Sequence, residues 1–214
     1  MKLMEQIRAA ISESHAAIEK TDFSKAMLSD YIHPMDYARG IAQLWYVHNA
    51  LELGIGKNAD LESFFTPEMV RTPTIVRDLT ALGYRLDSMD ALLETQTIVA
   101  TLQSWSKDLP FALLGCVYIL EGSRMGSLVI AKFLSKALGN EPGSSRFIEY
   151  HTEGASATPM RVRNLKEQIE RAELSQERAD AVKLGAVEFM NLLNDLYNAL
   201  PVNERQITSL AKAV

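Results

Sequence analysis

The feature that most constrains the fold is the spacing of apolar residues, which recur at helical intervals along most of the 214-residue chain. In the first segment, Leu3, Ile7 and Ile11 fall on one face, as they would on an amphipathic helix. No segment shows the strict alternation of polar and apolar residues that is typical of a half-buried strand. No long polar linker and no internal repeat divides the chain. We therefore predict an all-α protein of seven to nine helices that forms a single domain over residues 1–214.

Helix-capping residues and helix breakers indicate where these helices begin and end. Pro34 suits the first turn of a long helix that Gly54 ends, and Ser175 with Glu177 forms a helix start near a capping box. Residues 139–154 contain glycine, proline and serine and are predicted to be a loop. The predicted helices cover approximately residues 2–19, 25–29, 34–53, 66–72, 74–82, 87–106, 110–138, 160–172 and 175–200, with a short helix in the tail after residue 201.

Composition and charge narrow the class of protein. Apolar residues make up 47% of the chain and charged residues 23%, which suffices for a substantial core. A net charge of −5 disfavours nucleic-acid binding, which usually needs a basic face. Cys116 is the single cysteine, the N-terminus has no apolar leader, and the longest apolar run, 111–120, is shorter than the roughly 18–20 residues of a membrane span. We expect a cytoplasmic protein with neither a nucleic-acid nor a membrane partner.

Four polar residues share one face of the first predicted helix: Arg8, Ser12, His15 and Glu19 follow one another at spacings of 4, 3 and 4. A neutral imidazole is a good iron ligand, and a metal-bound histidine usually donates its other N–H to a carboxylate or carbonyl. Glu19 lies one turn from His15 and could be that acceptor. A solvent-facing polar stripe explains the same spacing, and this feature alone leaves both interpretations open.

A second face carries Gly115, Tyr118, Gly122 and Gly126, at spacings of 3, 4 and 4 within the apolar stretch 111–134. Each glycine inside a helix costs roughly 1 kcal/mol relative to alanine, so another interaction must offset the loss. Glycines allow close approach of a second helix, and they equally allow a flat ligand to lie against the backbone or the helix to kink. Both alternatives remain open at this stage.

Taken in order, five segments of the chain resemble the haem oxygenase family, in particular its bacterial, biliverdin-producing branch. They cover most of residues 5–195 and read IRAAISESHAAIEKTDFSKAML, WYVHNALE, FFTPEMVRTPTIVRDL, YILEGSRMGSLVIAKFL and VKLGAVEFMNLL. The resemblance implies a helical bundle with haem held between a proximal helix and a kinked distal helix.

The resemblance also implies roles for residues near the haem. His15 becomes the axial ligand of the iron, and Glu19 becomes its hydrogen-bond partner. Arg8 and Tyr118 match positions that contact the haem propionates. Further propionate partners are expected among the basic residues of the next-to-last helix, where this chain has Arg161, Arg163 and Lys166.

On the distal side, Gly122, Ser123 and Gly126 match the catalytic kinked helix that lies over the haem. Animal members of the family carry an aspartate directly after the first of these glycines, where this chain has Ser123. The route by which protons reach the site is therefore expected to differ from theirs.

By resemblance, haem b is both substrate and cofactor, O₂ is the co-substrate, and ferredoxin, flavodoxin or their reductase donates electrons. The implied products are biliverdin, CO and Fe²⁺. The alternative within the same fold is a protein that binds, senses or stores haem without cleaving it. A di-iron carboxylate protein is disfavoured because the chain has no Glu-x-x-His motif, and a purely structural bundle leaves the mid-helix glycines unexplained.

The remaining candidate residues have structural interpretations. His48 is predicted to lie at a helix interface, His33 in a turn before Pro34, and His151 on a loop surface. Cys116 is predicted to be a small buried residue rather than a nucleophile.

Overall fold

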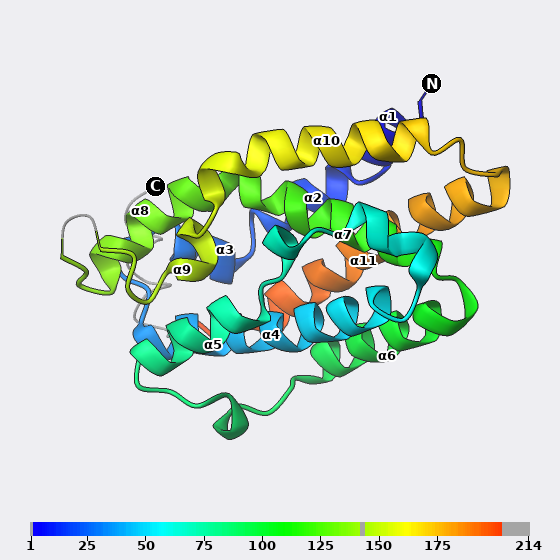
Figure 1. Cartoon of the computed structure of the whole chain (residues 1–214). Coiled ribbons are helices and arrows are strands. Elements are labelled where there is room, and N and C mark those ends of the chain that lie inside the picture. Colours follow the sequence, from blue (N-terminus) through cyan, green and yellow to red (C-terminus); the bar gives the residue numbers. More distant parts are fainter. Residues whose placement is uncertain (1, 142–143, 203–214) are drawn as a thin grey trace.

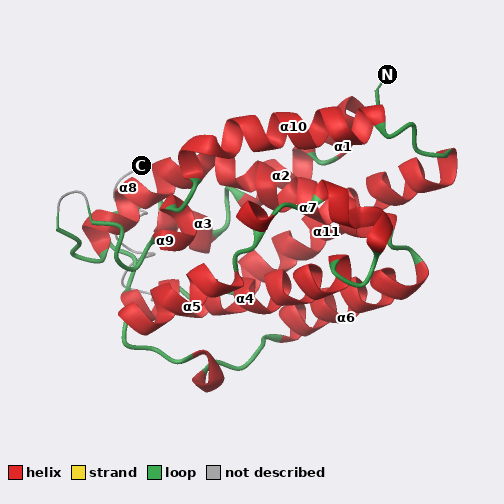
Figure 2. Ribbon diagram, viewed as in Figure 1, coloured by secondary structure: helices red, strands yellow, loops and turns green. Residues whose placement is uncertain are grey.

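The computed structural model describes residues 2–141 and 144–202, and within these ranges it contains helices and loops but no strand (Figure 2). The α-helices are α1 Leu3–Ala10, α2 Ser12–Ile18, α3 Asp22–Met27, α4 Pro34–Ile55, α5 Thr72–Ala81, α6 Leu93–Asp108, α7 Phe111–Ser123, α8 Ser127–Ala137, α9 Glu149–Thr152, α10 Thr158–Arg171 and α11 Gln176–Ala199. Short 3-10 helices are η1 Ala59–Phe64, η2 Pro67–Met69, η3 Leu86–Ser88, η4 Arg124–Gly126 and η5 Ala155–Ala157. The all-α prediction is confirmed, and the tail helix predicted after residue 201 lies outside the described residues.

The apolar helix α7 lies at the centre of the molecule, with α10 on one side and α4 and α6 on the other (Figure 1). Every residue from 111 to 120 is buried, and the most extensive helix–helix contact is that of α7 with α11. The two helices cross closely because each has a glycine there. A Cβ atom on Gly115 would come within 2.2 Å of the Val182 carbonyl oxygen, and one on Gly185 within 2.1 Å of the Ala112 carbonyl oxygen. Gly115 therefore allows α7 and α11 to cross at close range.

The predicted first helix is in fact two helices, which corrects the expected range 2–19. α1 ends at Ala10, and α2 begins at Ser12 after Ile11, whose ψ of −4° departs from that of a regular helix. The Ser12 hydroxyl donates to the Ala9 carbonyl oxygen at 2.9 Å, and such a bond competes with the backbone ladder. The break is slight, because the His15 amide still donates to the Ile11 carbonyl oxygen at 2.9 Å. The polar face of this segment is consequently preserved.

The long helix predicted over 110–138 is interrupted at η4, so that α7 and α8 are joined through a kink. The kink lies where the sequence has two glycines four residues apart, Gly122 and Gly126, and a serine hydroxyl beside the first. Ser123 donates this hydroxyl to the Leu120 carbonyl oxygen at 2.7 Å, an interaction that often bends helices. The kinked distal segment predicted by resemblance is confirmed.

The helix predicted to begin at residue 87 begins instead at Leu93, because side chains of α4 hold the preceding segment extended. Gln43 accepts a hydrogen bond from the Leu92 amide at 2.9 Å and donates one to the Asp90 carbonyl oxygen at 3.1 Å. Tyr46 donates to the Met89 carbonyl oxygen at 3.0 Å. These contacts use backbone groups that a longer helix would need for itself.

The segment predicted as a loop over 139–154 contains the short helix α9. Its first two amides, those of Glu149 and Tyr150, donate to the Asp78 carboxylate at 2.8 Å each. Asp78 lies on α5, so the cap that starts α9 comes from another helix. No local sequence signal could reveal it, which is why the loop prediction was wrong here.

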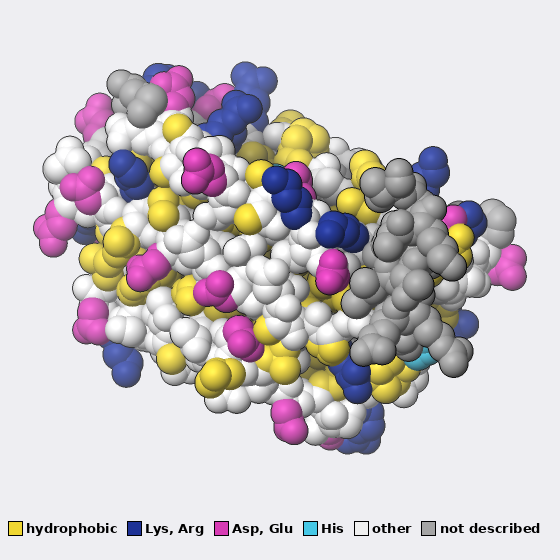
Figure 3. Space-filling view, turned by 180° about the vertical axis from the view of Figure 1, so that it is seen from behind, with side chains coloured by type: hydrophobic (Ala, Val, Ile, Leu, Met, Phe, Trp, Pro, Cys, Tyr) yellow, Lys and Arg dark blue, Asp and Glu magenta, His cyan; other side chains and the backbone are white. Residues whose placement is uncertain are grey.

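Taken through its kink, the segment Phe111–Ala137 is long and apolar enough to span a membrane by length and composition. However, 61% of its most apolar window is buried inside the molecule, and core helices have the same composition. On the face of the molecule shown in Figure 3, acidic and basic side chains are interspersed with apolar ones.

Candidate functional site

A cavity of about 510 Å³ lies between the N-terminal helices, α7, α10 and α11. Its volume is in the range of about 300–1,000 Å³ that is typical of pockets for small molecules and cofactors. Most of its wall is apolar, and the polar residues stand at a few places only. The lining residues are Arg8, Ile11, Ser12, His15, Ile18, Leu44, Tyr118, Ile119, Leu120, Gly122, Ser123, Met125, Tyr150, Val162, Lys166, Met190, Leu193 and Tyr197.

One wall of the cavity is the polar face of the N-terminal helices. His15 lines the cavity from α2, and its Nδ1 lies 3.6 Å from the Glu19 Oε1. Because Nδ1 is the nitrogen that meets the carboxylate, Nε2 is the nitrogen available to a ligand. Both side chains are more than half exposed, so this pair adds little to stability. Glu19 itself is not among the cavity-lining residues.

Two basic residues gather around Tyr118 on the same cavity. Lys166 of α10 places its Nζ 5.6 Å from the centre of the Tyr118 ring, and Arg8 of α1 lies close enough to act on the same phenol. Burial raises the pKa of Tyr118, so its hydroxyl stays protonated at neutral pH and can donate a hydrogen bond. The structure thus brings Arg8 and Tyr118 together on the cavity wall, and their predicted contact with haem propionates stays a prediction. Of the three basic residues expected on α10, only Lys166 lines the cavity, and Arg163 pairs with Glu167 on the outer face.

The end of α7 forms another wall. A Cβ atom placed on Gly122 or on Gly126 would meet no atom within 4 Å, in contrast to Gly115. Gly122 and Ser123 line the cavity, whereas Gly126 lies beyond it on η4. The two explanations offered for the glycines therefore apply to different positions: Gly115 allows close helix packing, and Gly122 leaves space for a ligand. The Ser123 hydroxyl is bonded to the backbone and retains its acceptor capacity.

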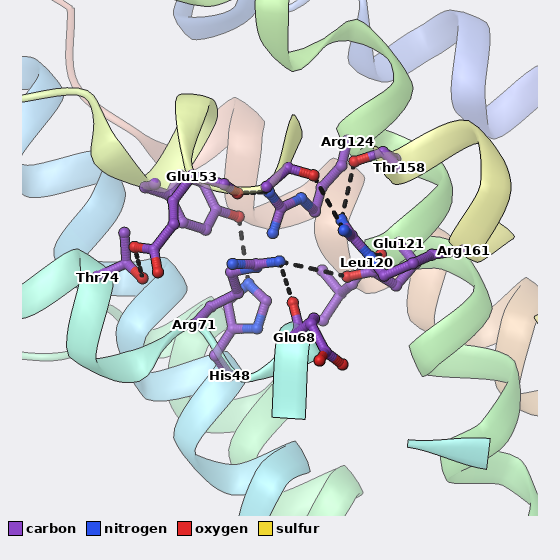
Figure 4. A network of polar contacts seen from close by, with 12 residues as sticks. His48, Glu68, Arg71, Thr74, Leu120, Glu121, Arg124, Glu153, Thr158 and Arg161 are labelled. Atoms are coloured by element: carbon purple, nitrogen blue, oxygen red, sulfur yellow. Dashed lines mark hydrogen bonds and ion pairs between the residues drawn. The ribbon is translucent and has the colours of Figure 1, made fainter. Parts of the chain in front are cut away.

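Behind this wall lies a buried charge cluster that the sequence interpretation did not assign to the site (Figure 4). Glu121, the residue before Gly122, is 4% exposed. Its carboxylate lies 3.1 Å from the Arg161 Nε of α10 and 4.0 Å from the Arg71 Nη2, at the start of α5. Burial lowers the pKa of Arg71, and the Glu121 carboxylate opposes that shift. In sequence, Glu121 and Arg124 appeared only as charges interrupting an apolar run, and that interruption was the available signal.

Arg124 extends this cluster along η4. It is 4% exposed and donates from Nη2 to the Glu153 carbonyl oxygen at 2.7 Å. Its Nε and Nη1 have no hydrogen-bond partner among the described residues. Glu153 lies just after α9, and its side chain accepts from the Thr74 hydroxyl at 3.2 Å. The kink is thereby tied to α5 and to the segment after α9.

Two buried histidines contact Tyr150, which lines the cavity, and one of them corrects a prediction. His48 is buried and its Nε2 lies 3.2 Å from the Tyr150 hydroxyl, which confirms the helix-interface interpretation. His151 was predicted on a loop surface but is 5% exposed on α9, and neither ring nitrogen has a partner among the described residues. Burial lowers the pKa of His48 to about 3, with Arg71 contributing, and that of His151 to about 4. Both are neutral at pH 7.

Cys116 is buried as predicted, and burial raises the pKa of its thiol.

In the described ranges, no group of three or more His, Cys, Asp and Glu side chains gathers in a way that could hold a metal ion. The cavity has His15 on one wall, Gly122 on another, and the two cations Arg8 and Lys166 near Tyr118. Such a lining suits a mostly apolar molecule that carries anionic groups.

Comparison with solved structures defines the class of this fold. The structure of the haem oxygenase from Leptospira interrogans superposes with a TM-score of 0.83 at 20% identity, covering 94% of this chain and all of that one. Haem oxygenase-1 from Synechocystis, solved in complex with haem, gives 0.80 at 20% identity and covers 100% and 97%. A TenA homologue from Pyrococcus furiosus gives 0.66 at 12% identity and covers 92% and 98%, so proteins with other names share the fold. The fold is that of the haem oxygenases and their relatives.

Sequence comparison identifies the family. The haem oxygenase family model matches residues 1–198, and the chain belongs to that family. A haem oxygenase from Guillardia theta is 27% identical over 153 residues, which cover 68% of this chain and 63% of the relative. The match to haem oxygenase 2 of Synechocystis is 28% over 81 residues and covers 32% of that protein. The chain thus spans less than two thirds of the length of these two relatives.

Proposed function

We propose that this protein is a haem oxygenase that cleaves haem b with O₂ and donated electrons to biliverdin, CO and Fe²⁺. The observation that carries the proposal is the cavity itself, which has His15 on one wall and the glycine-containing end of α7 on another. Membership of the family and the likeness to haem-bound structures support it.

Each cavity residue has a task in this proposal. His15 ligates the iron through Nε2 while Glu19 holds the other nitrogen. Arg8 and Lys166 bind the haem carboxylates, because two cations at one edge of an apolar cavity match two propionates. The apolar remainder of the wall excludes water and accepts the porphyrin faces.

On another wall of the cavity, Gly122 would let the backbone approach the ring, and Ser123 would offer a hydroxyl oxygen there. The bound haem supplies the iron at which O₂ is reduced. In the overall reaction both bonds of one methine carbon break, that carbon leaves as CO, and each flanking pyrrole carbon gains an oxygen. The oxidant is O₂, and a ferredoxin, a flavodoxin or their reductase supplies the electrons. We place the reaction in the cytoplasm, since its reductants belong to a reducing compartment.

The test is turnover by the purified chain. Haem is added to form the complex, and ferredoxin with its reductase and NADPH is supplied in air. We expect the Soret band to disappear and biliverdin to be found in the extract, with CO trapped by ferrous myoglobin. A Soret band that persists under these conditions would instead identify a haem-binding or haem-sensing protein, and absence of a Soret band after haem addition would overturn both.

A further inference from the structure

Glu121 is the only charged residue between 111 and 121, and it is almost completely buried. Burying a carboxylate is costly unless it is paired and hydrogen-bonded. A hydrophobic residue would continue the pattern of α7 at no such cost. The partners of this carboxylate therefore indicate what it does for the molecule.

Those partners come from segments far apart in sequence (Figure 4). Arg161 faces Glu121 at 3.1 Å and donates two further hydrogen bonds, to the Gly154 carbonyl oxygen and to the Thr158 hydroxyl, each at 2.9 Å. Arg71 lies 4.0 Å away on the other side and donates to the Glu68 carbonyl oxygen. The Glu121 carboxylate thus connects the end of α7 to α10 and to the η2–α5 connection.

The two glycines of the kinked segment have no comparable support. Gly122 and Gly126 have no side chains, and the space where a Cβ atom would lie contains no atom within 4 Å. The two glycines therefore add no side-chain packing that could hold the kinked segment in place. Its position is fixed from behind, by the ion pairs of Glu121 and by the contact of Arg124 with the Glu153 carbonyl oxygen.

We propose that Glu121 is a positioning residue: held between Arg71 and Arg161, it fixes the Gly122–Gly126 segment over the haem and thereby determines which methine carbon is cleaved. This inference rests on the proposed function. The methine carbons of haem are nearly equivalent in chemistry and in distance from the iron. With the ring's orientation set by Arg8 and Lys166 at the propionates, selection among them then depends on which edge of the ring the overlying backbone leaves open.

The decisive variant is Glu121→Gln, which keeps the shape of the side chain and removes its charge. Biliverdin isomers are separated by chromatography after turnover, and haem affinity is measured alongside. We expect wild-type protein to give one dominant isomer. Glu121→Gln should bind haem with similar affinity. It should give a mixture in which other isomers exceed about a tenth of the product, as expected when the rates of cleavage at the competing methine carbons differ by less than about tenfold.

Glu167→Gln is the matched control. Glu167 also lies between two arginines, Arg163 and Arg171, but on the exposed face of α10 and away from α7. This variant should keep the wild-type isomer pattern. A core variant such as Leu102→Ala on α6 controls for loss of stability as such, and it too should keep the pattern.

If Glu121→Gln does not fold, two gentler variants replace it. Glu121→Asp keeps the charge but shortens the reach to Arg161, and Arg161→Lys keeps the charge but loses the fork that binds Gly154 and Thr158. Both should broaden the isomer pattern. An unchanged single isomer in the folded variants overturns the proposal.

A second readout does not depend on turnover. Hydrogen exchange of the haem-free protein should be faster at residues 122–127 in the Glu121 variants than in Glu167→Gln. If wild-type protein binds haem without cleaving it, the proposed function fails, while this readout still reports on the positioning by Glu121. Equal exchange rates in all variants would count against the inference whatever the activity.

Discussion

At the scale of single residues, the cavity wall and the ion pairs behind it are formed by different side chains. Arg8, His15 and Tyr118 line the cavity, as the family resemblance implied. Glu121 and Arg161 were not foreseen as a pair because they are 40 residues apart and lie on different helices. Helical spacing relates residues only within one element, so an ion pair between elements has no signature in the sequence.

His15→Ala tests the iron ligand at this scale. We expect the variant to lose both turnover and the optical spectrum of histidine-ligated haem. Its melting temperature should stay close to that of wild type, because the side chain is more than half exposed. Optical titration with haem and thermal unfolding by circular dichroism measure the two effects. Added imidazole should restore the spectrum by filling the vacated position. An unchanged spectrum in His15→Ala would exclude this histidine as the ligand.

At the scale of elements, α7 combines two uses of glycine that its sequence pattern could not separate. Gly115 and Gly122 are seven residues apart and share a helical face. What lies opposite that face changes along the helix, from the backbone of α11 at Gly115 to the cavity at Gly122. Only the packing of other helices determines where that change occurs.

The two positions should consequently respond in opposite ways to alanine. Gly115→Ala forces a Cβ atom against the α11 backbone and should lower the free energy of unfolding by about 1–3 kcal/mol. Gly122→Ala meets no atom and should leave the haem-free protein as stable or up to about 1 kcal/mol more stable, because alanine favours the helix. Its haem turnover should nevertheless fall, since the methyl group enters the cavity. Urea unfolding and turnover assays measure both. Equal loss of stability in the two variants would contradict this division.

At the scale of the whole molecule, buried titratable groups couple stability to pH. His48 and His151 have folded pKa values of about 3 and about 4, whereas an unfolded histidine titrates near 6.5. Between pH 6 and pH 4 the unfolded chain therefore holds up to two histidine protons that the folded chain lacks. Asp78 acts in the opposite direction, because burial raises its pKa from 3.8 to about 6 and the folded chain gains that proton first.

The balance is one proton in favour of the unfolded chain, so the free energy of unfolding should fall by about 1.4 kcal/mol per unit as pH decreases from 6 to 4. His151→Phe removes one of the two histidine contributions and should nearly abolish this slope. Asp78→Asn removes the opposing contribution and should roughly double it. Urea unfolding at pH 4.5, 5.0 and 5.5 gives the three slopes, and identical slopes would refute the assignment of these groups.

The sequence by itself determined the helical class, because an apolar period near 3.6 residues is a local property, and it determined the face that presents Arg8, Ser12 and His15 for the same reason. Tertiary structure decided where a helix begins when the capping side chain belongs to another helix. Asp78 caps the start of α9 in this way, and Gln43 caps the start of α6. It also decided which glycine packs and which one lines the cavity, and it paired Glu121 with Arg71 and Arg161. Each of these depends on distances between segments remote in sequence, and such distances exist only once the core has formed.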